Sequence, residues 1–454
     1  MSLPLSDDAI TQRLAVYGRF GVHLGLERIQ RLLTALEHPE WQVPIVHVAG
    51  TNGKGSVCAY LSSVLTQASY RVGRYTSPHL VSWCERISLN GEPIAVVELD
   101  RVLTEVEAAI SPEHETPTQF EVVTAAAWLY FAQQAVDIAV IEVGLGGRLD
   151  ATNVVDKPLV TAITSLSREH WQRLGPTLAD IAGEKAGILK PQRPAVIGPL
   201  PPEAETVVLA RAAAVDCPVI RPEPSQINEQ GLATYNFSVT SRGSIQYRVP
   251  FAGVHQLTNS AIAIAALQAL RDQGWQITDQ AIQTGIAQAR WPGRLQWLTW
   301  SFQGEQSPPW LIDGAHNTAA ATVLRAYVDD ISQLHPPPAI AAELKQQGLT
   351  LPLAREVTWV MGMLSTKDHA DVFAALLRPG DRLHLVPVPD HDSMTPMALQ
   401  AIALKVCPDL ATCNPYETLE QGMTAASTDP TSLKILCGSL YLVGYFFQTQ
   451  LQGE

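Results

Sequence analysis

Short apolar runs alternate with longer alanine- and leucine-rich segments along most of the chain. The runs occupy residues 45–50, 136–144, 159–165, 195–198, 309–317, 357–364, 382–388 and 433–439. Runs that are apolar throughout are typical of strands buried on both faces, and intervening helical segments are typical of βαβ units. The pattern therefore predicts an α/β protein in which the runs form two series, each around a parallel sheet.

The stretch between the two series has a different pattern of polar and apolar residues. Within this stretch, which covers about 219–253, residues 236–251 resemble a polar-out hairpin, and an alanine-rich helix is expected over 259–269. A chain of 454 residues exceeds what one core usually holds, so two domains are expected. The predicted border lies at about residue 296, which gives domains 1–295 and 296–454. The Gly, Ser and Pro residues of 304–309, just after this border, are typical of a turn. Residues 335–352 are expected to form a surface insertion.

Composition and charge limit the classes of partner and compartment. The net charge of −13 disfavours a nucleic acid or an anionic membrane as partner, because such surfaces call for a basic face. The most apolar window, 436–447, falls short of the ~20 residues that cross a bilayer and predicts a buried strand that turns into a helix. The first residues lack the pattern of a secretory signal, and the six cysteines are too scattered for a zinc ribbon or a disulfide framework. A cytoplasmic location is expected.

The strongest local signal is a glycine-rich turn between a predicted strand and a predicted helix. It comprises Gly50, Thr51, Asn52, Gly53, Lys54, Gly55 and Ser56. Glycines let backbone N–H groups face phosphate oxygens, the helix N-terminus adds positive potential, and Lys54 supplies a mobile charge. Val48 and Gly55 depart from the general P-loop rule, which has Gly and Ser/Thr there. The turn predicts a triphosphate site; a plain βα turn with a solvated lysine is the alternative.

A carboxylate stands near the carboxyl end of the second apolar run. Glu142 stands where this predicted strand ends, just before the glycines of 144–147. In a doubly wound sheet that edge also carries the phosphate loop, so Glu142 can face a nucleotide and hold Mg²⁺. An ion pair between Glu142 and Arg148 is the alternative.

The form GTNGKGS at 50–56 resembles the phosphate loop of the folylpolyglutamate synthase/dihydrofolate synthase family, within the Mur ligase superfamily. Further likeness extends over roughly 20–445, in the segments 75–80, 167–175, 181–188, 255–259, 291–294, 311–317 and 438–441. The resemblance implies a P-loop-containing, doubly wound, mostly parallel sheet in a Mur ligase-like ATP-binding domain. It also implies a smaller Rossmann-like α/β C-terminal domain.

The same resemblance implies a magnesium site. Ser77 and His170 match the family's metal-ligating serine and histidine, and Lys185 matches its carbamylated lysine, which would help to hold a second Mg²⁺. Glu169 stands where the family usually has Asp. Taken singly, each residue has a plainer alternative: a turn serine, a surface or core histidine, and a helix-end cation.

The resemblance also implies contacts to nucleotide and substrate. Asn259, Arg294 and Asp313 match ATP-contacting residues, and His316 lies in the same C-terminal motif. The family's dihydropteroate contacts match Val22, His23, Thr118, Gln119, Phe120 and Glu121, and some bifunctional members have Asp where His23 stands. Phe120 could stack on a flat ring and Glu121 could bond its polar edge; core packing is the alternative for Phe120. Asp313 could be a turn aspartate, and Arg294 could form a boundary salt bridge.

Together these features predict a monomeric ATP-dependent amide ligase. ATP with two Mg²⁺ ions would phosphorylate a dihydropteroate or folyl-glutamate carboxylate, and the amino group of L-glutamate would then attack the acyl phosphate. The balance between dihydrofolate synthase and folylpolyglutamate synthase activity stays open. The alternatives are a Mur-type ligase that adds an amino acid to a UDP-linked peptide, and a nucleotide switch without ligase chemistry.

Overall fold

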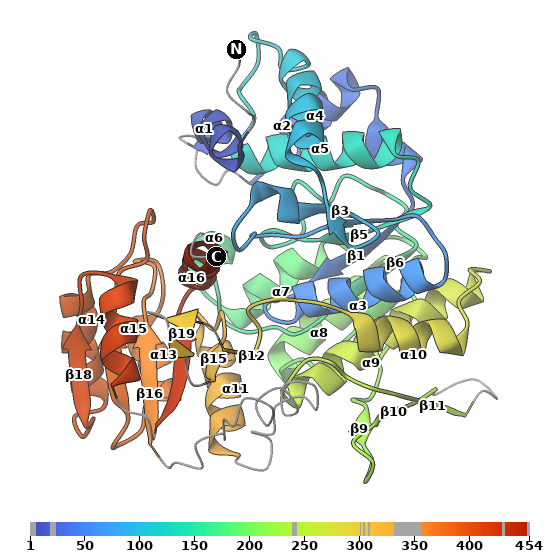
Figure 1. The fold of residues 1–454 in the computed structure, drawn as a ribbon. Helices are drawn as coiled ribbons and strands as arrows, with labels where there is room; N and C mark the ends of the chain where they lie inside the picture. The colour runs from blue at the N-terminus through green and yellow to red at the C-terminus, as the bar shows by residue number, and fades with distance from the viewer. Residues whose placement is uncertain are drawn as a thin grey trace. The chain divides into compact units, whose positions relative to one another are not determined.

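The computed structural model describes residues 6–18, 24–237, 243–299, 301–302, 305–306, 309–330, 356–428 and 432–451. The chain divides into two compact units (Figure 1). The first comprises Met1–Pro250 and Gln256–Arg290, and the second comprises Phe251–His255 and Trp291–Glu454. The insertion predicted at 335–352 lies outside the described residues.

The first unit is built on a sheet of eight described strands in the order β4-β3-β2-β5-β1-β6-β7-β8. Six of these strands run parallel, and β3 and β4 form an antiparallel edge. The bounds are β1 Ile45–Ala49, β2 Val72–Tyr75, β3 Ile87–Leu89, β4 Glu92–Pro93, β5 Ile138–Glu142, β6 Val160–Ile163, β7 Ala195–Ile197 and β8 Val219–Ile220. The four apolar runs predicted in this region are confirmed as β1, β5, β6 and β7.

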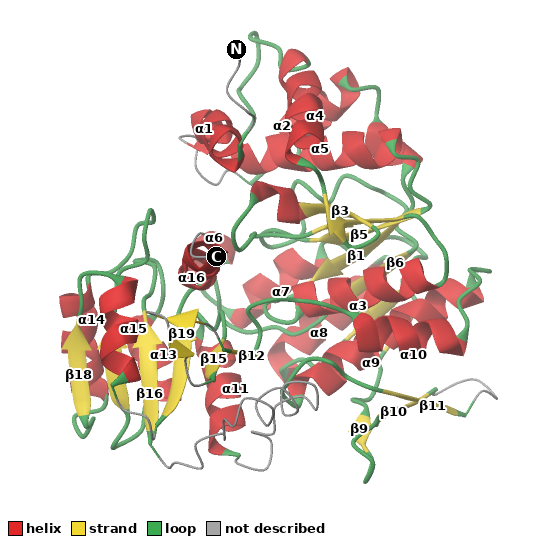
Figure 2. Cartoon of the chain, in the orientation of Figure 1, coloured by secondary structure: helices red, strands yellow, loops and turns green. Residues whose placement is uncertain are grey.

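Helices flank this sheet (Figure 2). Their bounds are α1 Asp7–Gly18, α2 Glu27–Ala35, α3 Lys54–Gln67, α4 Val96–Ala108, α5 Gln119–Gln133, α6 Trp171–Leu174, α7 Leu178–Ala186, α8 Pro202–Ala214, α9 His255–Asp272 and α10 Asp279–Gln288, with 3₁₀ turns η1 Pro39–Gln42 and η2 Trp83–Arg86. Strand residues such as Ile45 and Ile141 pack in one core with Val102 of α4 and Trp128 of α5. The carboxyl ends of the parallel strands therefore emerge from a fixed, packed layer.

The predicted hairpin is also present. Strands β9 Gln226–Ile227, β10 Ala233–Asn236 and β11 Ser244–Tyr247 form an antiparallel sheet. Its side chains alternate, with Tyr235 and Tyr247 buried while their strand neighbours are more exposed. The alanine-rich helix predicted at 259–269 lies within α9.

The second unit contains a sheet of six described strands in the order β12-β15-β19-β16-β17-β18, with only β12 antiparallel among them. The bounds are β12 Gln296–Leu298, β15 Trp310–Ile312, β16 Val357–Met361, β17 Arg382–Leu385, β18 Thr412–Pro415 and β19 Leu433–Cys437, with a separate ribbon of β13 Ser301–Phe302 and β14 Glu305–Gln306. The helices are α11 Thr318–Asp329, α13 His369–Leu376, α14 Pro396–Val406, α15 Leu419–Ser427 and α16 Leu440–Leu451.

The apolar window at 436–447 is the transition from β19 to α16, as predicted. Among the described helices, none combines the length and the apolar character that a membrane crossing requires. The molecule is thus a mixed α/β protein with two largely parallel sheets, which confirms the predicted fold class.

Candidate active site

The glycine-rich turn lies at the carboxyl end of β1 and leads into α3, which begins at Lys54. The segment after β6 clamps it: Thr51 N donates to the carbonyl oxygen of Ser165 at 2.7 Å, and the hydroxyl of Thr164 donates to the carbonyl oxygen of Asn52 at 2.6 Å. The first amides of a helix lack intrahelical partners and can face an anion. The backbone of the turn is therefore fixed by hydrogen bonds, and it lies directly before the N-terminus of α3.

Lys54 and Glu142 meet at this edge. In the parallel register of β1 and β5, Glu142 pairs with Val48, close to the turn. The Nζ of Lys54 lies 3.9 Å from Oε1 of Glu142, and only 4% of Glu142 is exposed. The backbone N–H of Ser77 donates to Oε2 of Glu142 at 3.3 Å. The fold thus brings the predicted lysine, carboxylate and serine together.

Lys185 reaches the same turn from α7. Its Nζ donates to the carbonyl oxygen of Gly50 at 2.8 Å, and the residue is 6% exposed. Burial first, and then the charge of Lys54, lowers the pKa of Lys185 to about 7, while Glu169 opposes the shift. With this pKa, about half of the Lys185 amines are uncharged near neutral pH.

His170 is more exposed to solvent than Glu142 and Lys185. It is the N-cap of α6 with a φ of 51°, its side chain is 48% exposed, and its Nε2 lies 3.9 Å from the carboxylate of Glu169. Within the described part of the chain, no three His, Cys, Asp or Glu side chains form a group that could hold a metal ion. Mg²⁺ usually takes one or two carboxylates and fills the other positions with water and phosphate oxygens. Glu142 meets that requirement, and the roles of His170 and Ser77 stay predictions.

Asn259 approaches the phosphate loop from α9. A Cβ on Gly53, whose φ is 86°, would run into the Asn259 amide, so this position needs glycine. The Nδ2 of Asn259 donates to Gln256 Oε1 at 3.1 Å, and the Nε2 of Gln256 donates to the hydroxyl of Ser56 at 3.3 Å. Gln256 was not predicted from the sequence, although its spacing from Asn259 places both on one helix face.

The predicted substrate residues lie at the start of α5. Thr118 caps the helix, and its side chain accepts from the backbone N–H of Glu121. The ring of Phe120 packs against Gly144, where a Cβ would collide with it. The side-chain amide of Gln119 donates to the carbonyl oxygen of Leu14 at 3.1 Å. The ring of Phe120 therefore lies against Gly144, which is two residues along the chain from the metal-binding candidate Glu142, and that approach requires glycine.

Glu121 has structural partners that the sequence did not reveal. Its carboxylate accepts from Thr118 N at 2.7 Å and from the Nε of buried Arg28 at 3.1 and 3.2 Å. These contacts tie the Glu121 carboxylate to Arg28 and to the N-terminus of α5, and its contact to a pterin ring stays a prediction. Val22 and His23, the other predicted pterin contacts, lie outside the described residues.

A buried network shapes the loop after β5. Asp150 accepts from the backbone N–H of Leu145 at 2.7 Å and from the backbone N–H and hydroxyl of Thr152 at 3.0 and 2.5 Å. The Thr152 hydroxyl is also 2.9 Å from Nε2 of His47. Burial raises the pKa of Asp150 and lowers the pKa of His47 to about 3. This loop carries the glycines that Phe120 and α7 contact, and the network went unpredicted because its partners are distant in sequence.

The second unit gathers three further predicted residues at the end of β15. Asp313 is buried, and its two oxygens accept from the backbone N–H groups of Leu295 and Ala315, each at 2.8 Å. Nη1 of Arg294 lies 3.2 Å from the carbonyl oxygen of Gly293, and Nδ1 of His316 lies 2.7 Å from the carbonyl oxygen of Gly314. Burial raises the pKa of Asp313, and the charge of Arg294 opposes this.

These contacts make Asp313 a clamp between β15 and the segment before β12. Its contact to a nucleotide ribose stays a prediction.

Two family models match the chain. Residues 296–449 match the dihydrofolate synthetase C-terminal domain, and residues 48–267 match the Mur ligase middle domain. The dihydrofolate synthetase of Saccharomyces cerevisiae is 32% identical over 440 residues, which are 93% of this chain and 97% of the relative. The dihydrofolate synthase/folylpolyglutamate synthase of Escherichia coli is 31% identical over 437 residues, 94% of this chain and 91% of the relative.

Solved structures agree over nearly the full length. The Mycobacterium tuberculosis folylpolyglutamate synthase complexed with ADP superposes with a TM-score of 0.82 at 29% identity, covering 98% of this chain and 99% of that one. Escherichia coli FolC in complex with DHPP and ADP gives a TM-score of 0.78 at 28% identity, covering 97% of each chain. Because these matches span both units and a 32% identical relative is covered over 97% of its length, the chain belongs to the dihydrofolate synthase/folylpolyglutamate synthase family.

Proposed function

We propose that the chain is an ATP-dependent amide ligase that joins L-glutamate to dihydropteroate, to folyl-glutamate, or to both. The observation that carries the proposal is the pairing of Lys54 with Glu142 at 3.9 Å beside the glycine-rich turn. This arrangement offers a cation for phosphate oxygens and a carboxylate for a metal at one edge of the sheet. The names of the relatives, and the ADP in two of the similar structures, support the same activity.

The triphosphate binds at the N-terminus of α3. Its oxygens accept from the amides of the turn, and Lys54 neutralises the terminal phosphate. The amide of Asn259 lies beside Gly53 of the turn, which supports a contact between Asn259 and the nucleotide. We assign Arg294 to phosphate oxygens and Asp313 to a ribose hydroxyl in the same proposal, with His316 alongside them.

Magnesium fits the residues at this edge. Glu142 is the buried carboxylate that would hold it, with Ser77 and His170 as the proposed further ligands. When bound, the ion would supply positive charge that offsets the negative charge of the phosphate groups.

Lys185 is suited to carbamate formation. Its pKa of about 7 makes the amine a nucleophile at mildly alkaline pH. The nitrogen of the neutral amine adds to the carbon of CO₂ and one proton is released to solvent, so a neutral amine becomes a carbamate anion. That anion, beside the carbonyl of Gly50, would help to hold a second magnesium ion.

The reaction needs no protein nucleophile. A carboxylate oxygen of the substrate attacks the terminal phosphorus of ATP, and ADP leaves. The amino group of glutamate then attacks the acyl carbon, phosphate leaves, and the nitrogen gives up a proton to solvent. The chain contributes position and charge through Lys54 and Glu142, and Phe120 offers a face on which a pterin ring stacks.

The test is a comparison of acceptors. Purified chain is assayed with Mg-ATP and labelled L-glutamate in parallel with dihydropteroate, tetrahydrofolate and a UDP-muramoyl acceptor. Label in either of the first two products is expected, and their ratio measures the balance of the two activities. Label only with the last acceptor, or ATP hydrolysis that ignores pterin and glutamate, would overturn the proposal.

The proposal also includes the domain boundaries and the oligomeric state. We propose that the ATP-binding domain comprises 1–295 and the glutamate-ligase domain 296–454, which is supported by the family model that starts at 296. A monomer is proposed as the working state, and sedimentation of the chain with and without ATP would test it.

A further inference from the structure

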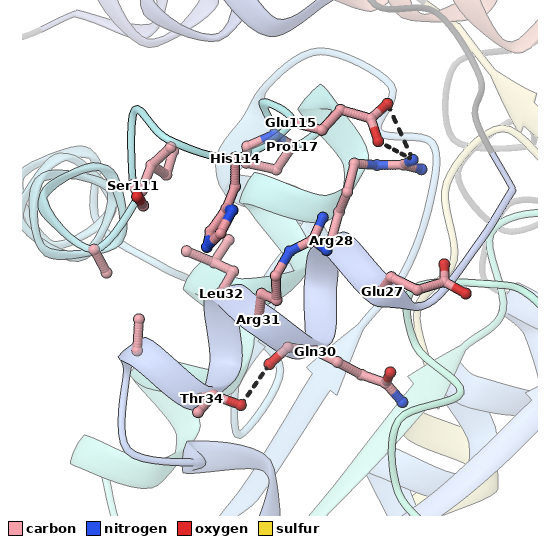
Figure 3. A pocket seen from close by; sticks show the side chains of 13 residues that line it. Glu27, Arg28, Gln30, Arg31, Leu32, Thr34, Ser111, His114, Glu115 and Pro117 are labelled. Atoms are coloured by element: carbon pink, nitrogen blue, oxygen red, sulfur yellow. Dashed lines mark hydrogen bonds and ion pairs between the residues drawn. The ribbon is translucent and has the colours of Figure 1, made fainter.

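A separate pocket lies in the first unit between α2 and the segment 109–117 that precedes α5 (Figure 3). Its volume is about 540 Å³, and its lining does not include the glycine-rich turn. Leu32 and Pro117 are buried and Ile110 is partly buried, which gives the pocket an apolar floor. A cavity of this size with a largely apolar lining is typical of sites for small organic molecules.

Cationic side chains converge on this floor. Arg28 and Arg31 stand one turn apart on α2, so their Cβ atoms are roughly 5–6 Å apart. In Figure 3 the side chains of Arg31 and His114 extend into the same space, and that of Glu27 points away from them. The pocket therefore presents two guanidinium groups above an apolar surface.

Two of the partners of Arg28, Glu121 and Glu115, hold it with different strength. Only 9% of it is exposed, and its Nε is bound by the buried Glu121 carboxylate at 3.1 Å. Its Nη1 reaches Glu115 at a longer 3.4 Å, and the Glu115 side chain is 61% exposed. Exposed ion pairs contribute little free energy. An incoming carboxylate can thus replace Glu115 without disturbing Glu121 and the cap of α5.

We propose that this pocket binds a small molecule in which an aromatic ring is joined to two carboxylates. One carboxylate takes the place of Glu115 on Arg28, the other pairs with Arg31, and the ring lies on Leu32, Ile110 and Pro117. The tail of a folyl-glutamate has this chemistry, and so does a simple aromatic dicarboxylate. Naming the folyl tail as a source rests on the proposed function, whereas the pocket chemistry does not.

Isothermal titration calorimetry on the full chain tests the proposal with two probes, 4-aminobenzoyl-L-glutamate and isophthalate. Arg31→Ala is compared with Arg101→Ala, in which an exposed arginine of α4 outside the pocket is removed. Loss of one charge-assisted contact should weaken probe binding by about tenfold or more in Arg31→Ala. Arg101→Ala should bind as the native chain does, and both variants should keep the ligase activity.

The outcomes separate the possible sources. Arg31-dependent binding of both probes supports a general aromatic dicarboxylate site, and Arg31-dependent binding of 4-aminobenzoyl-L-glutamate alone supports a folyl tail. Arg31-dependent binding of isophthalate alone supports the site and rejects the folyl tail. Binding of neither probe, or equal affinity in Arg31→Ala and the native chain, overturns the proposal. Absent ligase activity alongside Arg31-dependent binding would refute the proposed function alone.

Discussion

Removal of CO₂ from the assay tests the proposed role of Lys185 directly. Burial and the nearby Lys54 lower the pKa of this amine to about 7. At pH 8 that pKa leaves about ten neutral amines for each ammonium, whereas an ordinary lysine has about one neutral amine in 250. The site therefore offers roughly 200 times more reactive amine than a surface lysine.

The assay follows ligase rate at pH 8 in CO₂-free buffer, before and after addition of bicarbonate. The rate should fall by about 10- to 100-fold without CO₂, the range typical of losing a group that supports a metal site, and bicarbonate should restore it. With ¹³C-labelled bicarbonate, NMR should show a carbamate resonance that is absent in Lys185→Ala. The control is Lys190→Ala, which removes a partly buried lysine outside the site and should keep the bicarbonate response.

Full activity in CO₂-free buffer, together with no carbamate resonance in the native chain, would refute this reasoning. The buried amine would then act as a hydrogen-bond donor to the carbonyl of Gly50, as the distance of 2.8 Å allows.

Three further changes test other parts of the site. Lys54→Met should lower the ligase rate by roughly 100-fold or more, because the terminal phosphate loses its cation, and a rate near the native one would contradict the phosphate role. Gly144→Ala forces a Cβ to within 3.0 Å of ring atoms of Phe120; denaturant unfolding should show a loss of about 1–3 kcal/mol, which Phe120→Leu in the same chain should partly restore. His47 has a folded pKa of about 3, so its contribution to stability is complete above the unfolded pKa of about 6.5 and is lost as pH falls toward 3. The free energy of unfolding, measured with urea at pH 7 and at pH 4.5, should therefore fall by about 2–3 kcal/mol less in His47→Gln than in the native chain. Equal falls in the two proteins would contradict the burial argument.

The main strands could be located before the structure was known, because parallel strands buried on both faces are apolar throughout. Strand β2 was missed for the opposite reason. Its residues include Gly73, which lies against the ring of Phe131, and Arg74, whose charge interrupts the apolar pattern. Such a strand is specified by its neighbours on the sheet and not by its own hydrophobicity.

Some residues of the candidate site could likewise be predicted from the sequence, and others could not. Lys54 and Glu142 could be paired in advance, because Lys54 follows one apolar strand, Glu142 ends another, and parallel strands end at one edge of the sheet. Gln256 and Arg28 escaped prediction because their partners, Ser56 and Glu121, are 200 and 93 residues away along the chain. No local periodicity records a contact at that distance.

The order of residues alone determined the α/β class, the glycine-rich turn and the carboxylate at the end of β5, since each depends on a short-range pattern. Packing decided the rest. It buried Lys185 against Gly50 and so lowered its pKa, and it engaged Glu121 with Arg28. Desolvation and hydrogen-bond satisfaction depend on every group that surrounds an atom in space, and those groups are assembled only when distant segments fold together.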